Sequence, residues 1–261
     1  AEDGASIGTG VNPTFNLTVG THVLTLTVTD DEGGQGTDTI TVTIDNAPFG
    51  GRIIDDLQVM YTFEEGSGNT VADVSGAGTP IDLTIANTGA VTWDFGTLTV
   101  DSETTIESAI AAARVAEAIR ASDEITIEAW LTPSDLTLFG PARIFTMSGG
   151  SSARNFTLGQ GINDSLPRDV LDVRLRTSNT SQNGQPSLTG PTGLNTTLTH
   201  VVYTYSGGTA RMYIDGVQVA SDNIGGNLNN HNTSYKIGLA NEIGGGRPWV
   251  GTLHLVAVYS Q

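Results

Sequence analysis

Apolar side chains recur at every second position in several short stretches, and this spacing restricts the folds open to the chain. Residues 23–29 read Val-Leu-Thr-Leu-Thr-Val-Thr, so apolar side chains and threonines fall on opposite sides of an extended strand. Residues 37–44 repeat the alternation, and the turn-forming segment Asp-Asp-Glu-Gly-Gly (30–34) separates the two. We therefore expect a hairpin with one buried face.

The same alternation continues along the chain. Further strands are predicted over residues 57–63, 124–131, 200–205, 235–239 and 251–259. A second hairpin joins residues 211–214 to 217–220 through Asp215-Gly216, a dipeptide that favours a two-residue type I′ turn. Residues 105–121 have helical spacing, which predicts a helix of about four turns. Together these elements predict an all-β fold, a two-sheet antiparallel jelly-roll sandwich with one short helix.

Charge and cysteine content narrow the class of protein. The 261 residues have a formal net charge of −17 and include no cysteine. A disulfide framework, a thiolate zinc site and a cysteine nucleophile are therefore excluded. An acidic chain repels phosphate backbones and anionic lipids, so we expect neither nucleic acid as a partner nor membrane insertion. The opening Ala1-Glu2-Asp3 is not a signal peptide, and we expect a mature product or a piece of a longer protein.

The first strands carry a resemblance of their own. Residues 19–44, beginning Val-Gly-Thr-His-Val-Leu-Thr-Leu-Thr-Val-Thr-Asp, resemble the last strands of a polycystic kidney disease (PKD) domain, an immunoglobulin-like β-sandwich. Only the C-terminal half of such a domain is matched, so residues 1–46 are predicted to form a partial immunoglobulin-like sandwich. Its open apolar face would be covered by the next domain, by another chain or by more of a longer parent protein, and we favour the last.

A second domain is predicted over residues 53–261, after a Pro/Gly-containing linker at residues 47–52. Its motifs Tyr-Thr-Phe-Glu-Glu-Gly-Ser-Gly (61–68), Ile-Thr-Ile-Glu-Ala-Trp-Leu (125–131) and Met-Tyr-Ile-Asp-Gly (212–216) follow in an order that resembles the laminin G-like, concanavalin A-like jelly-roll domains of bacterial surface and secreted proteins. The resemblance implies a curved sandwich that binds glycans or proteins, often beside calcium, outside the cell or at its surface.

Calcium is the cofactor that the resemblance implies, and it takes about six to eight oxygen ligands. Two acidic loops, one in each predicted domain, are the candidate sites: Asp73, Ser75 and Gly78, and Asp30, Asp31 and Glu32. Relatives often end in an Ile-Asp-Glu-Val-like strand whose acidic pair helps to hold calcium, whereas this chain has His254 and Leu255 at that place. The alternative for both loops is that aspartate and glycine simply build turns.

Patterns typical of catalysis are missing from the sequence. Glycoside hydrolysis needs two carboxyl groups about 5–9.5 Å apart, and β-glucan-cleaving relatives place acids in a Glu-x-Asp-x-x-Glu string that does not occur here. Glu124 and Glu128 share a strand face, but at about 3.3 Å per residue their backbones are roughly 13 Å apart. The sequence has no Gly-x-Ser-x-Gly elbow, and its four histidines are far apart. We therefore expect a non-catalytic protein.

Glycan binding would use an aromatic ring beside polar side chains. Trp249 lies with Arg247 in a loop-like entry to the last strand. Arg174 and Arg176 alternate with apolar residues, so both are expected on the face away from the core, where Asn155 would extend a polar patch. These five residues are the candidate ligand contacts. The alternative for Trp249 is an aromatic side chain that caps the sheet edge.

Three functions follow from these observations. The favoured one is an extracellular recognition or adhesion module that binds a glycan or a surface protein. The second is a structural repeat or subunit of a surface filament or stalk, which would self-assemble by strand addition at the N-terminal half-domain. The third and least favoured is a polysaccharide hydrolase or lyase built on the same fold.

Overall fold

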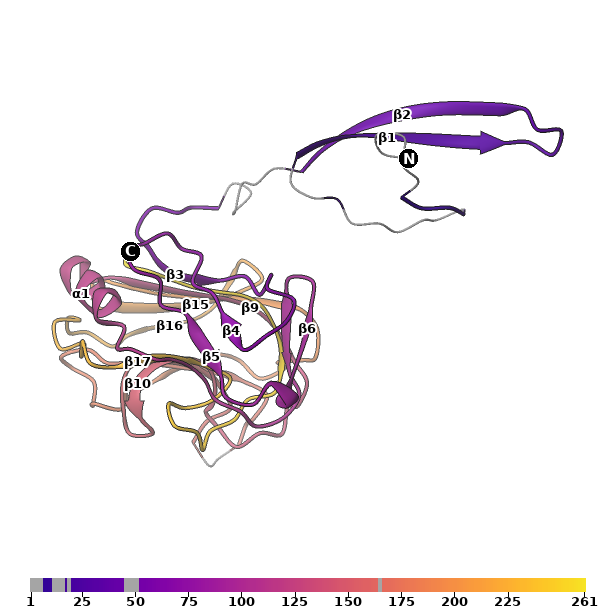
Figure 1. The fold of residues 1–261 in the computed structure, drawn as a ribbon. Coiled ribbons are helices and arrows are strands. Elements are labelled where there is room, and N and C mark those ends of the chain that lie inside the picture. Colours follow the sequence, from indigo (N-terminus) through magenta and orange to yellow (C-terminus); the bar gives the residue numbers. More distant parts are fainter. Residues whose placement is uncertain (1–6, 11–16, 18–19, 45–51, 164–165) are drawn as a thin grey trace. The chain divides into compact units, whose positions relative to one another are not determined.

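The chain divides into two compact units, Ala1–Ile53 and Ile54–Gln261 (Figure 1). The structure, a computed structural model, describes residues 7–10, 17, 20–44, 52–163 and 166–261. The predicted linker at residues 47–52 lies outside the described residues, apart from Arg52.

The first unit contains a two-stranded antiparallel ribbon, β1 (Gly20–Thr29) and β2 (Gln35–Ile44). The predicted hairpin is therefore present, but the predicted buried face is wrong. Leu26, Val28 and Ile40 are 62, 58 and 62% exposed. In the described residues the ribbon is a two-stranded sheet of its own, and a single layer cannot bury one of its faces.

The candidate calcium loop in this unit forms the turn of the ribbon. The carboxylate of Asp30 accepts hydrogen bonds from the amides of Glu32 and Gly34, at 3.0 and 2.6 Å. Asp31 is exposed to solvent. These contacts are typical of an Asx-type turn, in which the side chain satisfies the backbone of its own loop.

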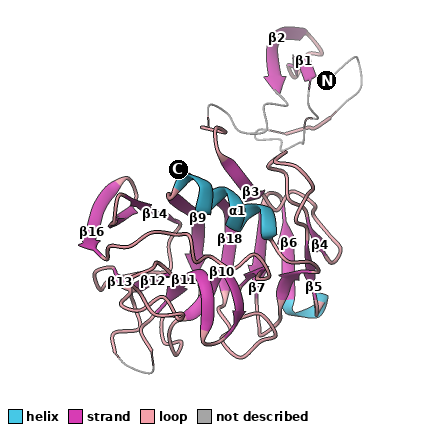
Figure 2. Cartoon of the chain, turned by 90° about the vertical axis from the view of Figure 1, so that its left-hand side faces the viewer, coloured by secondary structure: helices cyan, strands magenta, loops and turns pink. Residues whose placement is uncertain are grey.

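The second unit is built from two antiparallel sheets, which confirms the predicted all-β class (Figure 2). The first, the β10 sheet, has the order β13 (Leu188–Thr189), β12 (Leu171–Leu175), β11 (Ala153–Gln160), β10 (Ala142–Gly150), β17 (Lys236–Leu239), β8 (Ile106–Ser108), β5 (Leu83–Ile85), β4 (Thr70–Val71). The second, the β14 sheet, has the order β16 (Val217–Asn223), β15 (Thr209–Ile214), β14 (Thr199–Ser206), β9 (Ile125–Pro133), β18 (Gly251–Tyr259), β7 (Thr97–Val100), β6 (Val91–Asp94), with β3 (Leu57–Tyr61) paired to β18.

The core lies between the inner faces of the two sheets. Along β14 every second residue is buried, and Tyr203 and Tyr205 are among the largest buried side chains. Phe145 of β10 meets Phe156 of β11 edge to face, with ring centroids 5.2 Å apart. The alternation read from the sequence thus becomes the alternation of core and outer positions, as expected for a sandwich.

The helix is shorter than predicted. Residues 106–108 form β8, which pairs with both β17 and β5, and α1 begins only at Ala113 and ends at Ser122. Val115, Ala116 and Ile119 are its buried residues. Pairing between distant strands therefore overrode the helical spacing of residues 105–112, since local propensity is weak against tertiary contacts. A short 3₁₀ helix, η1, spans Thr88–Ala90.

The second predicted hairpin is present. β15 pairs with β16, and both turn residues have positive φ, 50° at Asp215 and 79° at Gly216, as a type I′ turn requires. The helices of the described chain are all too short or too polar to cross a lipid bilayer.

Candidate functional site

Charged side chains gather at the face of the β10 sheet that points away from the core. Phe145 and Met147 of β10 and Val173 of β12 belong to the core, and side chains alternate across a strand, so Thr146, Asp172 and Arg174 point outward. Arg143 lies with them because a register shift between Arg143 and Phe145 adds one residue to β10. Three arginines and two carboxylates meet there, each at most 3% exposed, and together they form the arginine cluster: Arg143, Arg154, Asp172, Arg174 and Glu242.

A β-bulge places Arg154 in this cluster. Met147 pairs with Phe156 and Ser148 pairs with Arg154, so Asn155 has no partner on β10. The extra residue turns Arg154 to the outward face, where its Nη1 donates to the hydroxyl of Thr157 at 2.9 Å. Bulges commonly redirect a side chain in this way, and simple alternation would have placed these two residues on opposite faces.

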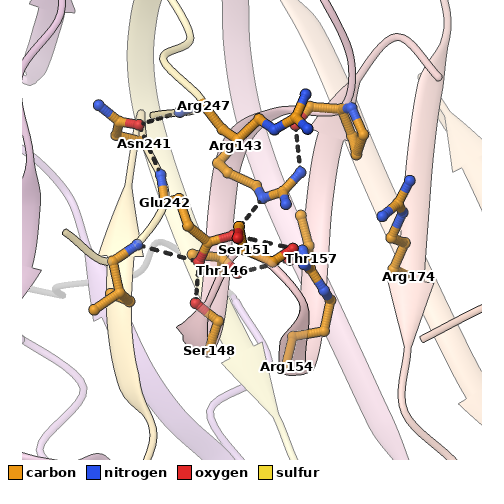
Figure 3. Close-up of polar contacts among 12 residues, drawn as sticks. Arg143, Thr146, Ser148, Ser151, Arg154, Thr157, Arg174, Asn241, Glu242 and Arg247 are labelled. Carbon is orange, nitrogen blue, oxygen red and sulfur yellow. Dashed lines mark hydrogen bonds and ion pairs between the residues drawn. The ribbon is translucent and has the colours of Figure 1, made fainter. Parts of the chain in front are cut away.

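Glu242 lies at the centre of the arginine cluster (Figure 3). Its Oε2 accepts a hydrogen bond from Nε of Arg143 at 2.8 Å and lies 3.6 Å from Nη1 of Arg154. The hydroxyl of Ser148 donates to its other oxygen. Burial by itself raises the pKa of Glu242, but Arg143, the Ser148 hydrogen bond and Arg154 outweigh burial and hold the pKa below its ordinary value.

A second ion pair completes the cluster on the neighbouring strand. Nε of Arg174 donates to Oδ2 of Asp172 at 3.3 Å, and the Thr189 hydroxyl donates to Oδ1 of Asp172 at 2.9 Å. Burial lowers the pKa of Arg154 to about 9, and the charge of Arg143 acts in the same direction. The guanidinium groups therefore repel one another, and the two carboxylates offset the free-energy cost of burying these positive charges.

The charges of the arginine cluster are paired with one another inside the domain. A general acid of a glycosidase needs a raised pKa so that it carries a proton at neutral pH. Glu242 has the opposite shift and stays ionised between two guanidinium groups. It therefore ties β10, β11 and the segment after β17 together.

The candidate ligand residues are partly brought together. Arg174 belongs to the arginine cluster. Burial lowers the pKa of the Arg143 guanidinium group, and the positive charge of Arg247 acts on it in the same direction. Arg247 is half-buried, and its Nη1 donates to the carbonyl of Gly140 at 3.3 Å. Arg176 is half-buried and follows the end of β12.

Two candidate ligand residues are fully buried. Trp249 is 0% exposed, and its Nε1 donates to Oε1 of Gln160 at 3.0 Å. Asn155 is also 0% exposed, and its side-chain amide exchanges two hydrogen bonds with the backbone of Asn232, at 2.9 and 2.7 Å. A ligand at the surface would not reach either side chain, because both are fully buried and hydrogen-bonded inside the domain.

The candidate calcium loop of the second unit is occupied by an arginine. Asp73, predicted as a metal ligand, is buried and forms an ion pair with Arg114 at 2.7 Å. The amide of Ser75 donates to Asp73 Oδ1 at 3.1 Å, and Gly78 packs beside the Arg114 side chain. In the described parts of the chain, no three histidine, aspartate or glutamate residues converge as a metal site.

The β14 sheet carries a polar group that sequence reasoning missed. Trp130 stacks on His200, with ring centroids 4.2 Å apart and planes 16° from parallel. Oε1 of Glu128 lies 3.2 Å from Nε1 of Trp130 and 3.1 Å from Nε2 of His200, and Tyr259 donates to its other oxygen at 3.3 Å. The three strands that supply these residues are neighbours only in the sheet, so their meeting could not be read from spacing along the chain.

An open pocket lies at the edge of the sandwich, between the loop after β13 and the β15–β16 hairpin. We call it the edge pocket; its volume is about 230 Å³. Its apolar lining comes from Leu171, Leu194, Ile214 and Val219, and its polar lining includes Thr192, Asn195, Thr197 and Asp215. An apolar lining with a few polar groups is the usual character of a small-molecule site.

Both walls of the edge pocket are held by hydrogen bonds. Asp169 accepts the amides of Gly193 and Leu194, at 3.0 Å each, through its side chain and its carbonyl. On the opposite wall Asp215 accepts the amide of His200 at 2.9 Å. These hydrogen bonds fix the backbone of both walls.

Comparison with known proteins identifies the second unit. A laminin G-like family, described as the concanavalin A-like lectin/glucanases superfamily, matches residues 105–261. The chain belongs to this superfamily. The match does not include β1 and β2, so the resemblance of this ribbon to a PKD domain stays a prediction. No curated protein matches the chain in sequence.

Solved structures agree with the concanavalin A-like fold. Domain 4 of an extracellular arabinanase from Geobacillus stearothermophilus, in complex with arabinotriose, has 15% identity and a TM-score of 0.52, over 78% of this chain and 92% of that one. A Trypanosoma rangeli sialidase has 14% identity and a TM-score of 0.55, over 79% of this chain and 30% of the sialidase. The binding domain of botulinum neurotoxin serotype C1 has 14% identity and a TM-score of 0.54, over 80% and 50%. At these identities the likeness concerns the fold alone.

Proposed function

We propose that the concanavalin A-like domain is a non-catalytic recognition module that binds a neutral glycan in the edge pocket, outside the cell or at its surface. The observation that carries this proposal is the edge pocket itself, because it is open to solvent while the arginine cluster is buried and internally paired. The arabinanase domain of similar fold, solved with arabinotriose, supports the choice of ligand class.

The lining of the edge pocket fits a sugar ring. A pyranose or furanose presents a face of C–H groups and an edge of hydroxyl groups. Ile214 and Val219 supply apolar surface. The Thr192 hydroxyl can donate and accept hydrogen bonds, and Asn195 can donate through Nδ2, since its Oδ1 accepts from Thr197. At about 230 Å³ the pocket is smaller than the roughly 300–1,000 Å³ of drug-sized sites, which favours one ring of a longer chain.

Charge favours a neutral glycan over an acidic one. Asp215 lines the edge pocket and Asp169 supports its wall, and the chain as a whole has a net charge of −17. A uronic or sialic acid would meet repulsion from these groups. Glu242, the carboxylate at the centre of the arginine cluster, is buried and paired with Arg143 and Arg154, so it is not open to a substrate.

A glycan array followed by calorimetric titration tests the proposal. Thr192→Trp places an indole in the pocket and is expected to weaken glycan binding at least about tenfold, or about 1.4 kcal/mol. Ser102→Trp is the matched control, since Ser102 is exposed and follows β7, near the opposite edge of the β14 sheet. Unchanged binding by Thr192→Trp, or no binding to any neutral glycan, would overturn the proposal.

A second function, assembly through the ribbon, is favoured by its exposed apolar side chains. Leu26 and Ile40 lie on one side of a two-stranded sheet, and both are 62% exposed. A two-stranded sheet is marginal alone and gains stability from added strands. Light scattering should show concentration-dependent self-association that Leu26→Thr with Ile40→Thr removes. A monomer at all concentrations would exclude this function.

A further inference from the structure

Three segments of the second unit meet at one guanidinium group, that of Arg114 near the start of α1. Its Nη2 donates to Oδ2 of Asp73 at 2.7 Å, and its Nε donates to the carbonyl of Thr79 at 3.1 Å. Its Nη1 donates to the carbonyl of Gln58 in β3. The side chain thus joins the helix, β3 and the loop between β4 and β5.

The oxygens around Arg114 are of the kind that calcium prefers, one carboxylate and two main-chain carbonyls. The loop also bends sharply around them, with φ of 71° at Gly76 and 68° at Gly78. A Cβ atom at Gly78 would lie 3.6 Å from Cδ of Arg114, so the loop wraps closely around the arginine side chain. The loop has the composition of a cation site, and a side-chain cation lies inside it.

Asp73 already has a full set of hydrogen-bond donors. Its Oδ1 accepts the amides of Met60 and Ser75, at 3.2 and 3.1 Å, and its Oδ2 accepts the amide of Ile81 at 3.0 Å in addition to Arg114. The Asp73 side chain is 0% exposed. A calcium ion, which takes about six to eight oxygen ligands, would have to displace Arg114, so these residues do not fit calcium.

We propose that Arg114 takes the place of a divalent cation in this domain, and that the stability of the domain is therefore independent of calcium. The planar guanidinium group presents several donors in a fixed arrangement, and this geometry lets one side chain reach three oxygens from two further segments. A chelator cannot remove a charge that is covalently part of the chain.

Thermal unfolding of the full chain, in EDTA and in millimolar calcium chloride, tests the proposal. The wild-type Tm is expected to be the same in both. Arg114→Ala removes the guanidinium and should lower the Tm in EDTA by about 5–10 °C, because a buried carboxylate loses its partner. Calcium should then raise the Tm of this variant. Arg120→Ala, on the exposed side of the same helix, is the control and should leave the Tm unchanged.

Either of two results would overturn the proposal: a calcium-dependent rise in the wild-type Tm, or an Arg114→Ala variant that gains no response to calcium. Should Arg114→Ala fail to fold in EDTA, Arg114→Lys is the second variant. Lysine keeps the charge but lacks the fork of donors, so we expect a smaller loss of Tm and no calcium response. Calcium binding by Arg114→Lys in titration calorimetry, or a Tm of this variant that rises with calcium, would count against the assignment.

Discussion

The carboxylate of Glu242 and the guanidinium of Arg143 form an ion pair in which both side chains are only 1% exposed, with Nε and Oε2 2.8 Å apart. Glu242 also lies 3.6 Å from Nη1 of Arg154, so one carboxylate serves two buried cations. Burying such a pair brings little net stability, but removing one partner leaves an uncompensated charge in the interior.

Glu242→Gln should therefore destabilise the domain by about 3–5 kcal/mol, measured by urea unfolding. The amide keeps the shape of the side chain but turns a donor toward the arginines. Glu107→Gln is the control. Glu107 pairs with Lys236 at 3.4 Å near the surface, where the two side chains are 26% and 34% exposed. Glu107→Gln should lower the free energy of unfolding by less than about 1 kcal/mol. Equal losses for the two substitutions would show that the Glu242 ion pairs are no more important than a surface pair.

His231 should make the domain sensitive to mild acid. Burial lowers the pKa of His231 to about 3, and its Nε2 lies 2.9 Å from the carbonyl of Arg176. The unfolded histidine titrates near pH 6.5, so the stabilisation is complete above about pH 6.5 and is lost at about 1.4 kcal/mol per pH unit as the pH falls toward 3.

The measurement for His231 is the free energy of unfolding between pH 7 and 5. His231→Gln should flatten its slope with pH, because glutamine keeps a donor for the Arg176 carbonyl and carries no titrating group. Glu242 contributes only below the pH range of this measurement. Its lowered pKa means that its stabilisation is present above about pH 4.3 and is lost at lower pH. An unchanged slope in His231→Gln would show that this histidine is not buried neutral.

Two glycines with similar backbone conformations should respond differently to alanine. Gly216 has φ of 79° and open space where a Cβ would be, whereas Gly184 has φ of 67° and a Cβ there would lie 2.9 Å from the amide nitrogen of Leu175. Gly216→Ala should cost about 1–2 kcal/mol from backbone strain alone. Gly184→Ala should cost at least about 1 kcal/mol more, since a clash with backbone is added. If the two alanine substitutions lowered the free energy of unfolding by similar amounts, the close approach of the Leu175 backbone to Gly184 would be contradicted.

Trp249 should matter for stability and not for ligand binding. Trp249→Phe removes the donor to Gln160 and leaves a buried oxygen without its partner, which we expect to cost about 2–4 kcal/mol. Trp93→Phe is the control. Trp93 is half-buried and donates to the carbonyl of Gly68 at 3.0 Å near solvent, so its loss should be smaller. Glycan affinity that falls with Trp249→Phe, at a temperature where the variant is folded, would restore Trp249 as a ligand contact.

The candidate site could be predicted in part. The alternation of apolar and polar residues correctly predicted that Arg174 points away from the core. This prediction needs only the neighbouring residues, because successive side chains of a strand point to opposite faces. Alternation could not anticipate that Glu242 would meet Arg143, which is 99 residues away in sequence, nor that a bulge would turn Arg154 to the same side. The sequence predicts Asp73 as a calcium ligand in an acidic loop, but the cation that it pairs with is Arg114, which lies on a different element.

The sequence by itself determined the all-β class, nine of the eighteen described strands and the Asp215-Gly216 turn, because each depends on residues that are neighbours along the chain. Tertiary structure decided where the helix begins, which charges are paired and which surface is open. Those outcomes depend on strand order and register: β8 is a strand because β17 and β5 flank it, and the edge pocket exists because a loop and a hairpin from different sheets lie side by side. Such contacts join residues far apart in the chain, and the free energy they contribute exceeds local preference.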